Sequence, residues 1–262
     1  MEQNEFAHHW LLDPEVIFLN HGSFGATPRA VIEEQEKIRR RIETEPLLFF
    51  DHHYLEEIDR ARADLAAFLG ARTDDLAFVV NATTGVNTVL RSLRLQAGDE
   101  LLVTDHEYNA CRNAIGAVAE AVGAVVVVAP IPFPLGDEEE VIEAVLERVS
   151  SRTRLLLVDH VTSQTGLVLP IERLVGEVQG RGVDVLVDGA HAPGMVALDL
   201  EKLGAAYYTG NCHKWICAPK GAAFLHVRED RRDRVRPLVI SHGANATSTA
   251  RSHFHLEHDW TG

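Results

Sequence analysis

The stretch Val183-Asp-Val-Leu-Val-Asp-Gly-Ala-His191 decides the fold class of this chain. Its Val and Leu residues form a nearly continuous apolar run, which predicts a strand buried on both faces. Such strands belong to parallel sheets that carry helices on each side. Asp188 ends the run, and ligands of these sheets bind at the carboxyl ends of the strands. The stretch therefore predicts an α/β fold whose chemistry lies just after each strand.

Runs of the same kind recur along the chain and alternate with helical patterns. About seven strands are predicted: Leu76 to Val80, Glu100 to Thr104, Ala124 to Ala129, Arg154 to Val158, Val183 to Val187, Ala205 to Thr209 and Ala222 to Val227. Helices are predicted over Arg29 to Glu43, Asp51 to Leu69, Thr84 to Leu93, Ala110 to Val122 and Asp137 to Val149. This order predicts a three-layer α/β domain with a mostly parallel sheet.

The two ends of the chain differ from this regular pattern. Residues 1–28 are rich in Gly and polar side chains and predict an entrance loop, and residues 29–236 hold the α/β pattern. Residues 237–262 predict a loop and the start of a strand, Phe254 to Trp260, with no closing element. We therefore expect a second, C-terminal domain that is largely missing from the sequence.

Composition excludes several classes of function. The chain has 25 Lys+Arg and 39 Asp+Glu, a net charge of −14, which disfavours binding to nucleic acid or to an anionic membrane surface. The longest apolar stretch, Gly123 to Pro134, is too short to span a bilayer. Three cysteines and an acidic N-terminus without a signal-peptide pattern predict a cytoplasmic protein without a disulfide framework.

Two strand ends carry groups suited to an anion and to an aromatic ring. Asn81-Ala-Thr-Thr-Gly85 follows the first strand and opens a helix, so it is either a phosphate site or an ordinary N-terminal cap. Asp105-His-Glu-Tyr-Asn109 follows the second strand. There His106 or Tyr108 either presents a ring to a cofactor or only packs. Neither stretch decides the matter alone.

Three further strand ends carry acids, hydroxyls and a lysine. Asp159-His-Val-Thr-Ser-Gln-Thr-Gly166 is denser in polar groups than a simple connection needs. Asp188 ends a buried strand. A carboxylate at this position either pairs with a cation, because burial of an unpaired charge is costly, or caps the next segment. Lys214, in Gly210-Asn-Cys-His-Lys-Trp215, is either a surface lysine or an amine whose pKa an apolar pocket lowers, as imine formation requires. Along the chain, the candidate phosphate turn comes first, followed by the aromatic ring, the acid Asp188 and then Lys214. This is the order that one cofactor requires.

These motifs resemble the class V aminotransferase family of pyridoxal-phosphate (PLP) enzymes of fold type I. The resemblance rests on Asn81-Ala-Thr-Thr, Asp105-His106, Asp188-Gly-Ala-His191 and Asn211-Cys-His213-Lys214. Leu19-Asn-His-Gly-Ser-Phe-Gly25 and Asp159-His-Val-Thr-Ser163 are most similar to the isopenicillin N epimerase-like branch. The resemblance covers nearly the whole chain.

The resemblance implies a role for each matching residue. Lys214 would hold PLP as an imine and move protons, Asp188 would pair with the pyridinium nitrogen, and His106 would stack on the ring, with Tyr108 in reserve. The other positions that the resemblance assigns are His191 near the phenolic oxygen, Ala82, Thr83, Asn211 and His213 at the phosphate, Thr162 and Ser163 beside the ring, and Asn20 and His21 near the substrate. Lys214, His106 and Asp188 form the implied catalytic set.

The chain also departs from the family pattern. Family members continue into a small domain that supplies an arginine for the substrate carboxylate and a Thr-Gly-Thr loop for the partner's phosphate, in a homodimer. This chain stops at Thr261-Gly262. Cys111, Cys212 and Cys217 do not match the nucleophilic cysteine of the desulfurases. The expected result is a poor catalyst whose large domain still folds.

Several functions remain open from the sequence. The first is isopenicillin N epimerase-like chemistry at the α-carbon of a small amino-acid substrate; the second is that of a PLP-dependent C–S lyase or cysteine desulfurase relative; the third is an impaired fragment or binding module. A metal site is a minor alternative, because His253 and His255 would share one face of a strand near His258. The motif match favours PLP and no metal.

Overall fold

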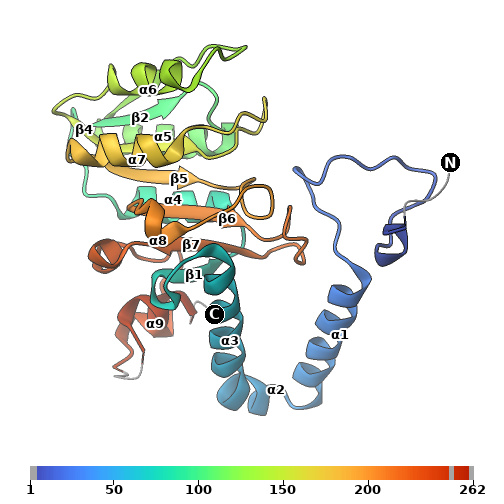
Figure 1. Ribbon diagram of the computed structural model, residues 1–262. Coiled ribbons are helices and arrows are strands. Elements are labelled where there is room, and N and C mark those ends of the chain that lie inside the picture. The colour runs from blue at the N-terminus through green and yellow to red at the C-terminus, as the bar shows by residue number, and fades with distance from the viewer. Residues whose placement is uncertain (1–4, 248–250, 260–262) are drawn as a thin grey trace.

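The computed structural model describes residues 5–247 and 251–259, and Figure 1 shows a sheet with helices on both sides. The seven strands lie in the order β1-β7-β6-β5-β4-β2-β3. Their bounds are β1 Leu76–Val79, β2 Glu100–Thr104, β3 Val125–Ala129, β4 Thr153–Asp159, β5 Asp184–Asp188, β6 Tyr207–Asn211 and β7 Ala223–Val227. Strand β7 runs antiparallel to both β6 and β1, and the remaining pairs are parallel. The predicted mostly parallel sheet is confirmed.

The helices divide between the two faces of the sheet. The larger ones are α1 Arg29–Thr44, α3 Tyr54–Leu69, α4 Ala82–Ser92, α5 Asn109–Val122, α6 Glu138–Leu146 and α7 Ile171–Gly180; shorter ones are α2 Pro46–Leu48, α8 Leu200–Leu203 and α9 His253–Asp259. Apolar residues of α3, α6, α7 and α8 form one core cluster, and those of α4, α5 and α9 form the other. The molecule therefore has three layers, as the sequence predicts.

The strand sequences explain why both faces are covered. Leu101 and Val103 of β2 belong to the α4/α5 core, whereas Leu102 between them belongs to the α6/α7 core. All three are fully buried, and burying a side chain of this size stabilises the fold by roughly 1.5–3 kcal/mol. A strand with apolar residues on both faces is stable only between two layers of helices.

Helices α7 and α8 are additions to the predicted elements. Helix α7 begins at Ile171, directly after Pro170, and buries Leu174 and Val178. It packs on β5 and closes the crossover between β4 and β5. The sequence pattern there is short and contains Gly176 and Gly180, both poor helix formers.

The segment Phe254 to Trp260 is not a strand, so that expectation is wrong; Trp260 itself lies outside the described residues. His253–Asp259 forms helix α9, whose residues from Phe254 onward are buried. On a helix, residues two apart point to different sides, so His253 and His255 do not share a face. His255 Nε2 lies 3.1 Å from the Leu76 carbonyl oxygen and His258 Nδ1 lies 2.9 Å from that of Phe254. One nitrogen of each ring is therefore used in packing α9.

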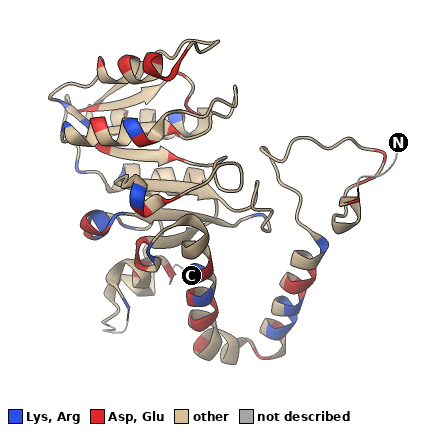
Figure 2. Cartoon of the chain, viewed as in Figure 1, with Lys and Arg blue, Asp and Glu red and all other residues tan. Residues whose placement is uncertain are grey.

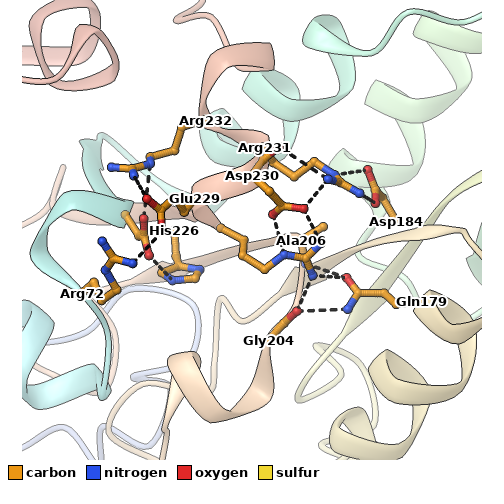
Figure 3. Close-up of polar contacts among 12 residues, drawn as sticks. Arg72, Gln179, Asp184, Gly204, Ala206, His226, Glu229, Asp230, Arg231 and Arg232 are labelled. Atoms are coloured by element: carbon orange, nitrogen blue, oxygen red, sulfur yellow. Dashed lines mark hydrogen bonds and ion pairs between the residues drawn. The ribbon is translucent and has the colours of Figure 1, made fainter.

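The charge run from Arg228 to Arg236 closes the end of the sheet opposite the motif-bearing strand ends. It includes the 3-10 turn Glu229–Arg234, and Figure 3 shows how its side chains reach neighbouring elements. Arg231 donates to both carboxylate oxygens of Asp184, at 2.9 and 2.8 Å. Arg228 donates to the Gln179 side chain and, at 2.7 Å, to the Gly204 carbonyl. The run therefore ties β5, α7 and α8 together.

Helix α1 projects from the rest of the molecule, whereas the loop before it stays near the sheet, where the Thr27 hydroxyl donates to the Ala218 carbonyl (Figure 1). In Figure 1 helix α1 extends away from the sheet, and Figure 2 shows charged residues along α1 and α3. No residue of α1 is fully buried. The division into residues 1–28, 29–236 and 237–262 stays a prediction. Within the described residues, no helix combines the length and apolar character needed to cross a membrane.

Candidate active site

The carboxyl ends of β4, β5 and β6 meet at one edge of the sheet. Asp159 is in register with Asp188, and Asp188 with Thr209. Beside them lies a cavity of about 360 Å³. It is lined by Gly22, Ser23, Phe24, Asn81, Ala82, Thr83, Tyr108, Asp159, Ser163, Asp188, Ala190, His191, Asn211, His213 and Lys214. Segments distant in the sequence thus converge on one site, as the strand-end argument predicts.

Helix α4 points its N-terminus at this cavity. Asn81 caps it, and the Asn81 side chain accepts from the Thr84 N–H at 2.8 Å. The Ala82 N–H donates to Asn211 Oδ1 at 2.9 Å, while the Thr83 N–H has no partner among the described residues. A free N–H at the positive end of a helix suits an anion. His213 Nδ1 lies 2.9 Å from the Ala222 carbonyl, which leaves its other ring nitrogen available.

A glycine allows α4 to sit this close to the sheet. A Cβ on Gly85 would lie 2.2 Å from Thr209 Oγ1 and 2.8 Å from Thr209 Cβ. Any side chain at this position would therefore push the first turn of α4 away from β6. The position of the anion-binding end of the helix depends on this contact.

Lys214 is the amine of the cavity. Its Nζ lies 3.2 Å from His191 Nε2. Burial lowers the pKa of Lys214, although Asp188 and Asp159 act in the opposite direction. Burial, aided by the Lys214 charge, lowers the pKa of His191 to about 4. His191 is therefore neutral at physiological pH and can accept a hydrogen bond from the lysine.

Two buried acids lie at the other end of the cavity. Asp188 is 1% exposed and accepts from the Ala190 N–H at 2.9 Å and from Cys111 Sγ at 3.2 Å. Asp159 is 2% exposed, and its Oδ2 has no partner among the described residues. Burial raises the pKa of both carboxyl groups, and for Asp159 the Asp188 charge adds to the effect. Two adjacent buried carboxylates are costly unless a cation compensates their charge, so the site suits a ligand that carries a cation.

The structure brings most of the implied site residues together. Eight line the cavity: Ala82, Thr83, Ser163, Asp188, His191, Asn211, His213 and Lys214. Thr162 is buried just behind the wall, where its hydroxyl accepts from the Leu167 N–H at 2.8 Å. It shapes the loop that carries Ser163 instead of facing the cavity.

His106 is not on the cavity wall, contrary to the expectation that its ring stacks on a cofactor. Its two ring nitrogens lie 3.0 Å from Thr165 Oγ1 and 3.2 Å from the Ile131 carbonyl, and these contacts hold it aside. Tyr108, the reserve candidate, lines the cavity in its place. The two residues are two positions apart in the turn before α5, and sequence spacing alone does not show which of them faces the cavity.

Asn20 and His21 also lie outside the cavity wall. Asn20 Oδ1 accepts from the Ser23 N–H at 3.2 Å, and His21 Nδ1 accepts from the Ala26 N–H at 3.2 Å. Their hydrogen bonds shape the entrance loop, whose next residues, Gly22 to Phe24, face the cavity. The entrance loop is therefore at the site, but through different residues.

The sequence reasoning missed the acid Asp159. The sequence pattern predicts it only as part of a polar loop. The signal was the same as for Asp188: a carboxylate directly after a buried Val/Leu run, on what proves to be the neighbouring strand. Strand order is needed to see that the two acids are adjacent, and the sequence does not give it.

The geometry fits a ligand with an anion at one end and a cationic ring nitrogen at the other. The free Thr83 N–H marks the first end, and the unpartnered Asp159 oxygen with Asp188 marks the second. A model of the family described as aminotransferase class-V matches residues 18–258. The chain belongs to the class-V aminotransferase family. The PLP fit deduced from the motifs thus agrees with the donors and acids that the cavity offers.

Relatives in this family are epimerases and C–S cleaving enzymes. The chain is 44% identical to isopenicillin N epimerase of Amycolatopsis lactamdurans, over 88% of this chain and 59% of that protein. It is 38% identical to that of Streptomyces clavuligerus, over 88% and 58%, and 34% identical to putative L-cysteine desulfhydrase 1 of Oryza sativa subsp. japonica, over 91% and 52%. The chain thus spans little more than half the length of these relatives.

A solved structure with the same fold carries the cofactor. It is a mutant of C-DES with glycine covalently linked to its PLP cofactor, with a TM-score of 0.81 and 25% identity over 90% of this chain and 62% of that chain. A complex of the cystine C–S lyase C-DES with cysteine persulfide gives a TM-score of 0.86 at 24% identity, over 94% and 67%. The second likeness bears on the fold alone.

Proposed function

We propose that this chain carries the cofactor site of a PLP-dependent enzyme that acts at the α-carbon of an amino acid. The observation that carries the proposal is the placement of Lys214 in one cavity with the buried acids Asp159 and Asp188 and the N-terminus of α4. A lysine amine, an acid that faces the ring nitrogen and an anion site for the phosphate are features by which a protein binds PLP. The family membership and the PLP-bound structural relative support the same proposal.

Each part of the cofactor has residues that would hold it. The phosphate would bind the Thr83 N–H and hydroxyl, with the Asn211 amide and the free nitrogen of His213 beside it. The ring nitrogen would face Asp188, and Tyr108 would cover the ring. His191 and Ser163 line the remaining wall. Asn20 and His21 would act on the substrate only through the loop that they shape.

PLP, when bound, supplies a carbonyl that joins amines and a protonated ring that withdraws electrons from the bonds of the substrate α-carbon. Lys214 meets the demands of that chemistry. Its lowered pKa increases the fraction of neutral amine, which is the form that binds a carbonyl and accepts a proton at Nζ. His191 Nε2, at 3.2 Å, orients this nitrogen. Asp188 would keep the ring nitrogen of PLP protonated, because a buried carboxylate favours a neighbouring cation.

We propose epimerisation as the first candidate reaction. It is supported by the two isopenicillin N epimerases at 44% and 38% identity. C–S cleavage is the second candidate, supported by the L-cysteine desulfhydrase at 34% identity. The described cysteines offer no nucleophile for a desulfurase: Cys111 and Cys212 are buried, and burial raises the pKa of each of the three thiols.

The experiment is incubation of the PLP-loaded chain with a panel of amino acids in deuterated water. Deuterium at the α-carbon together with the opposite enantiomer supports epimerisation. Release of sulfide and pyruvate from cysteine supports C–S cleavage. The matched control is Lys214→Ala, which should do neither. No exchange with any amino acid, by a chain that binds PLP, would contradict action at the α-carbon.

Two finer features also belong to the proposal. A homodimer is proposed from the family pattern and from the large exposed apolar side chains near α2, which include Leu47 and Phe50. A cytoplasmic setting is proposed because all three cysteines are free. Sedimentation of the chain and fractionation of cells that express it would test these two points.

A further inference from the structure

Glu107 is a buried acid beside the cavity that none of the roles above uses. It is 1% exposed and lies in the turn between β2 and α5. Neither of its carboxyl oxygens has a hydrogen-bond partner among the described residues. An ionised carboxylate in this condition would cost several kcal/mol, so the position needs a physical explanation.

The neighbours of Glu107 are mostly acidic. A carboxyl oxygen of Glu107, Cys111 Sγ and a carboxyl oxygen of Asp188 lie within 4.8 Å of one another. Asp159 also acts on Glu107 from β4, and the one cation among the groups acting on it is Arg112, an exposed residue of α5. Three buried carboxyl groups and a thiol therefore share one region beneath the cavity.

A charge count shows that one of the three acids must be neutral. Lys214 supplies at most one positive charge to this region, and a protonated ring nitrogen would supply a second. Two carboxylates balance these two charges, and a third would be an uncompensated buried charge. Without cofactor the excess of acids over cations is larger still.

Glu107 is the acid with the least support for a negative charge. Asp188 accepts two hydrogen bonds, and both Asp188 and Asp159 are stabilised by Lys214. Lys214 does not act on Glu107, whose negative charge is favoured only by the Tyr108 backbone N–H and the exposed Arg112. Burial, followed by the charges of Asp159 and Asp188, raises the pKa of Glu107 well above its ordinary value.

We propose that Glu107 is a positioning residue that stays protonated at neutral pH and acts as a neutral donor behind the Asp159–Asp188 pair. A carboxyl oxygen of Glu107 lies within 4.8 Å of a carboxyl oxygen of Asp188, so its O–H is near the pair, and Cys111 already donates to Asp188. The pair is thereby kept ionised and fixed in place for a cation in the cavity. The role toward the ring nitrogen rests on the proposed function; the proton on Glu107 does not.

The proton is tested directly by infrared spectroscopy of the chain without cofactor. Wild type labelled with ¹³C at the glutamate carboxyl should show a protonated-acid carbonyl band at neutral pH, and this band should vanish in Glu107→Gln. The matched control is Glu120→Gln, an exposed acid of the following helix α5, which should lose only a carboxylate band. Loss of only a carboxylate band in Glu107→Gln would overturn the proposal.

The positioning role is tested with two variants in the PLP-loaded chain. Glu107→Gln keeps a neutral donor, so the dissociation constant of PLP should stay within about threefold of wild type and the pH titration of its absorbance should be unchanged. Glu107→Leu removes the donor and should raise that constant about tenfold or more, since a hydrogen bond to an ionised group is worth this much. It should also shift the titration midpoint. Thermal melting checks that both variants fold.

The outcomes separate the two proposals. A protonated-acid band in a chain that does not bind PLP would support this inference and contradict the proposed function. Equal disruption by Glu107→Gln and Glu107→Leu in folded proteins would overturn the positioning role. A stoichiometric metal ion that is lost in Glu107→Gln would also overturn it, because the acids would then be compensated by the ion.

Discussion

At the scale of single residues, the cavity depends on a few ionisable side chains that are buried or half-buried. Lys214 and Asp188 were predictable from the sequence, because each directly follows an apolar strand and each is unusual there. Glu107 and Asp159 were not, because their effect arises from strands that become neighbours only in the folded sheet. The type of a side chain and its place in a motif are enough to propose a role. They do not show which residues it contacts.

Asp188→Asn should spare PLP binding more than turnover. The amide keeps the shape of the side chain but cannot stabilise a cation, so deuterium exchange at the substrate α-carbon should fall about 100-fold or more. The matched control is Asp184→Asn at the other end of β5, where the carboxylate pairs with Arg231 and not with the cavity. Exchange at the wild-type rate in Asp188→Asn would contradict the role assigned to this acid.

The buried His226 should make the folded chain less stable at acidic pH. Burial lowers its pKa to about 4 from an ordinary value of 6.5. As the pH falls below about 6.5 the unfolded chain takes up the proton first, so the folded state loses stability until about pH 4. The full effect would be up to about 3 kcal/mol.

The measurement is urea unfolding of wild type and His226→Gln at several pH values. The difference in unfolding free energy between the two proteins should be constant above pH 6.5. Between pH 6.5 and pH 4 the variant should become more stable relative to wild type. His226 lies on β7, away from the cavity, so PLP binding should not change. Parallel pH curves for the two proteins would show that this histidine is not the cause.

At the scale of elements, the predicted strands match the observed ones to within about two residues, because continuous Val/Leu runs leave few alternatives. Helix α7 was missed because its glycines weaken the helical pattern. In the region of helix α9, Phe254 and Leu256 alternate with polar residues, a pattern that favours a strand. The helix is selected by tertiary contacts with β1, which no local pattern contains.

Gly85 and Gly116 allow a matched test of how α4 is placed. Gly85→Ala would set a Cβ 2.2 Å from Thr209 Oγ1 and should displace the first turn of α4, which lowers stability and weakens PLP binding. Gly116→Ala on α5 meets nothing within 4 Å and should stabilise the chain by up to about 1 kcal/mol, because alanine favours a helix. Thermal melting and PLP titration measure both. Equal behaviour of the two variants would contradict the contact between α4 and β6.

At the scale of the whole molecule, a buried ion pair joins the last described helix to α3. The side chains of Arg62 and Asp259 are each about 1% exposed, and Arg62 Nη2 lies 2.5 Å from Asp259 Oδ1. Asp59 and Arg251 extend the network at its edge. The pair fixes α9 against the sheet and so completes one of its two covering layers.

Asp259→Ala should therefore cost about 3–5 kcal/mol of unfolding free energy, because it leaves the Arg62 charge buried without its main partner. The control is Asp64→Ala, an exposed acid of the same helix α3, which should change stability by less than about 0.5 kcal/mol. Urea unfolding measures both variants. Equal stability of the two would mean that α9 is not held by this pair.

The central claim is that Lys214 is the residue to which the cofactor is attached. The chain has only four lysines, Lys37, Lys202, Lys214 and Lys220, so attachment is easily assigned. The measurement is mass spectrometry of peptides from the PLP-loaded chain after reduction with borohydride. The account predicts the added mass of the cofactor on the peptide that contains Lys214, and its absence in Lys214→Ala. Attachment to one of the other three lysines, or none at all in a folded chain saturated with PLP, would contradict it.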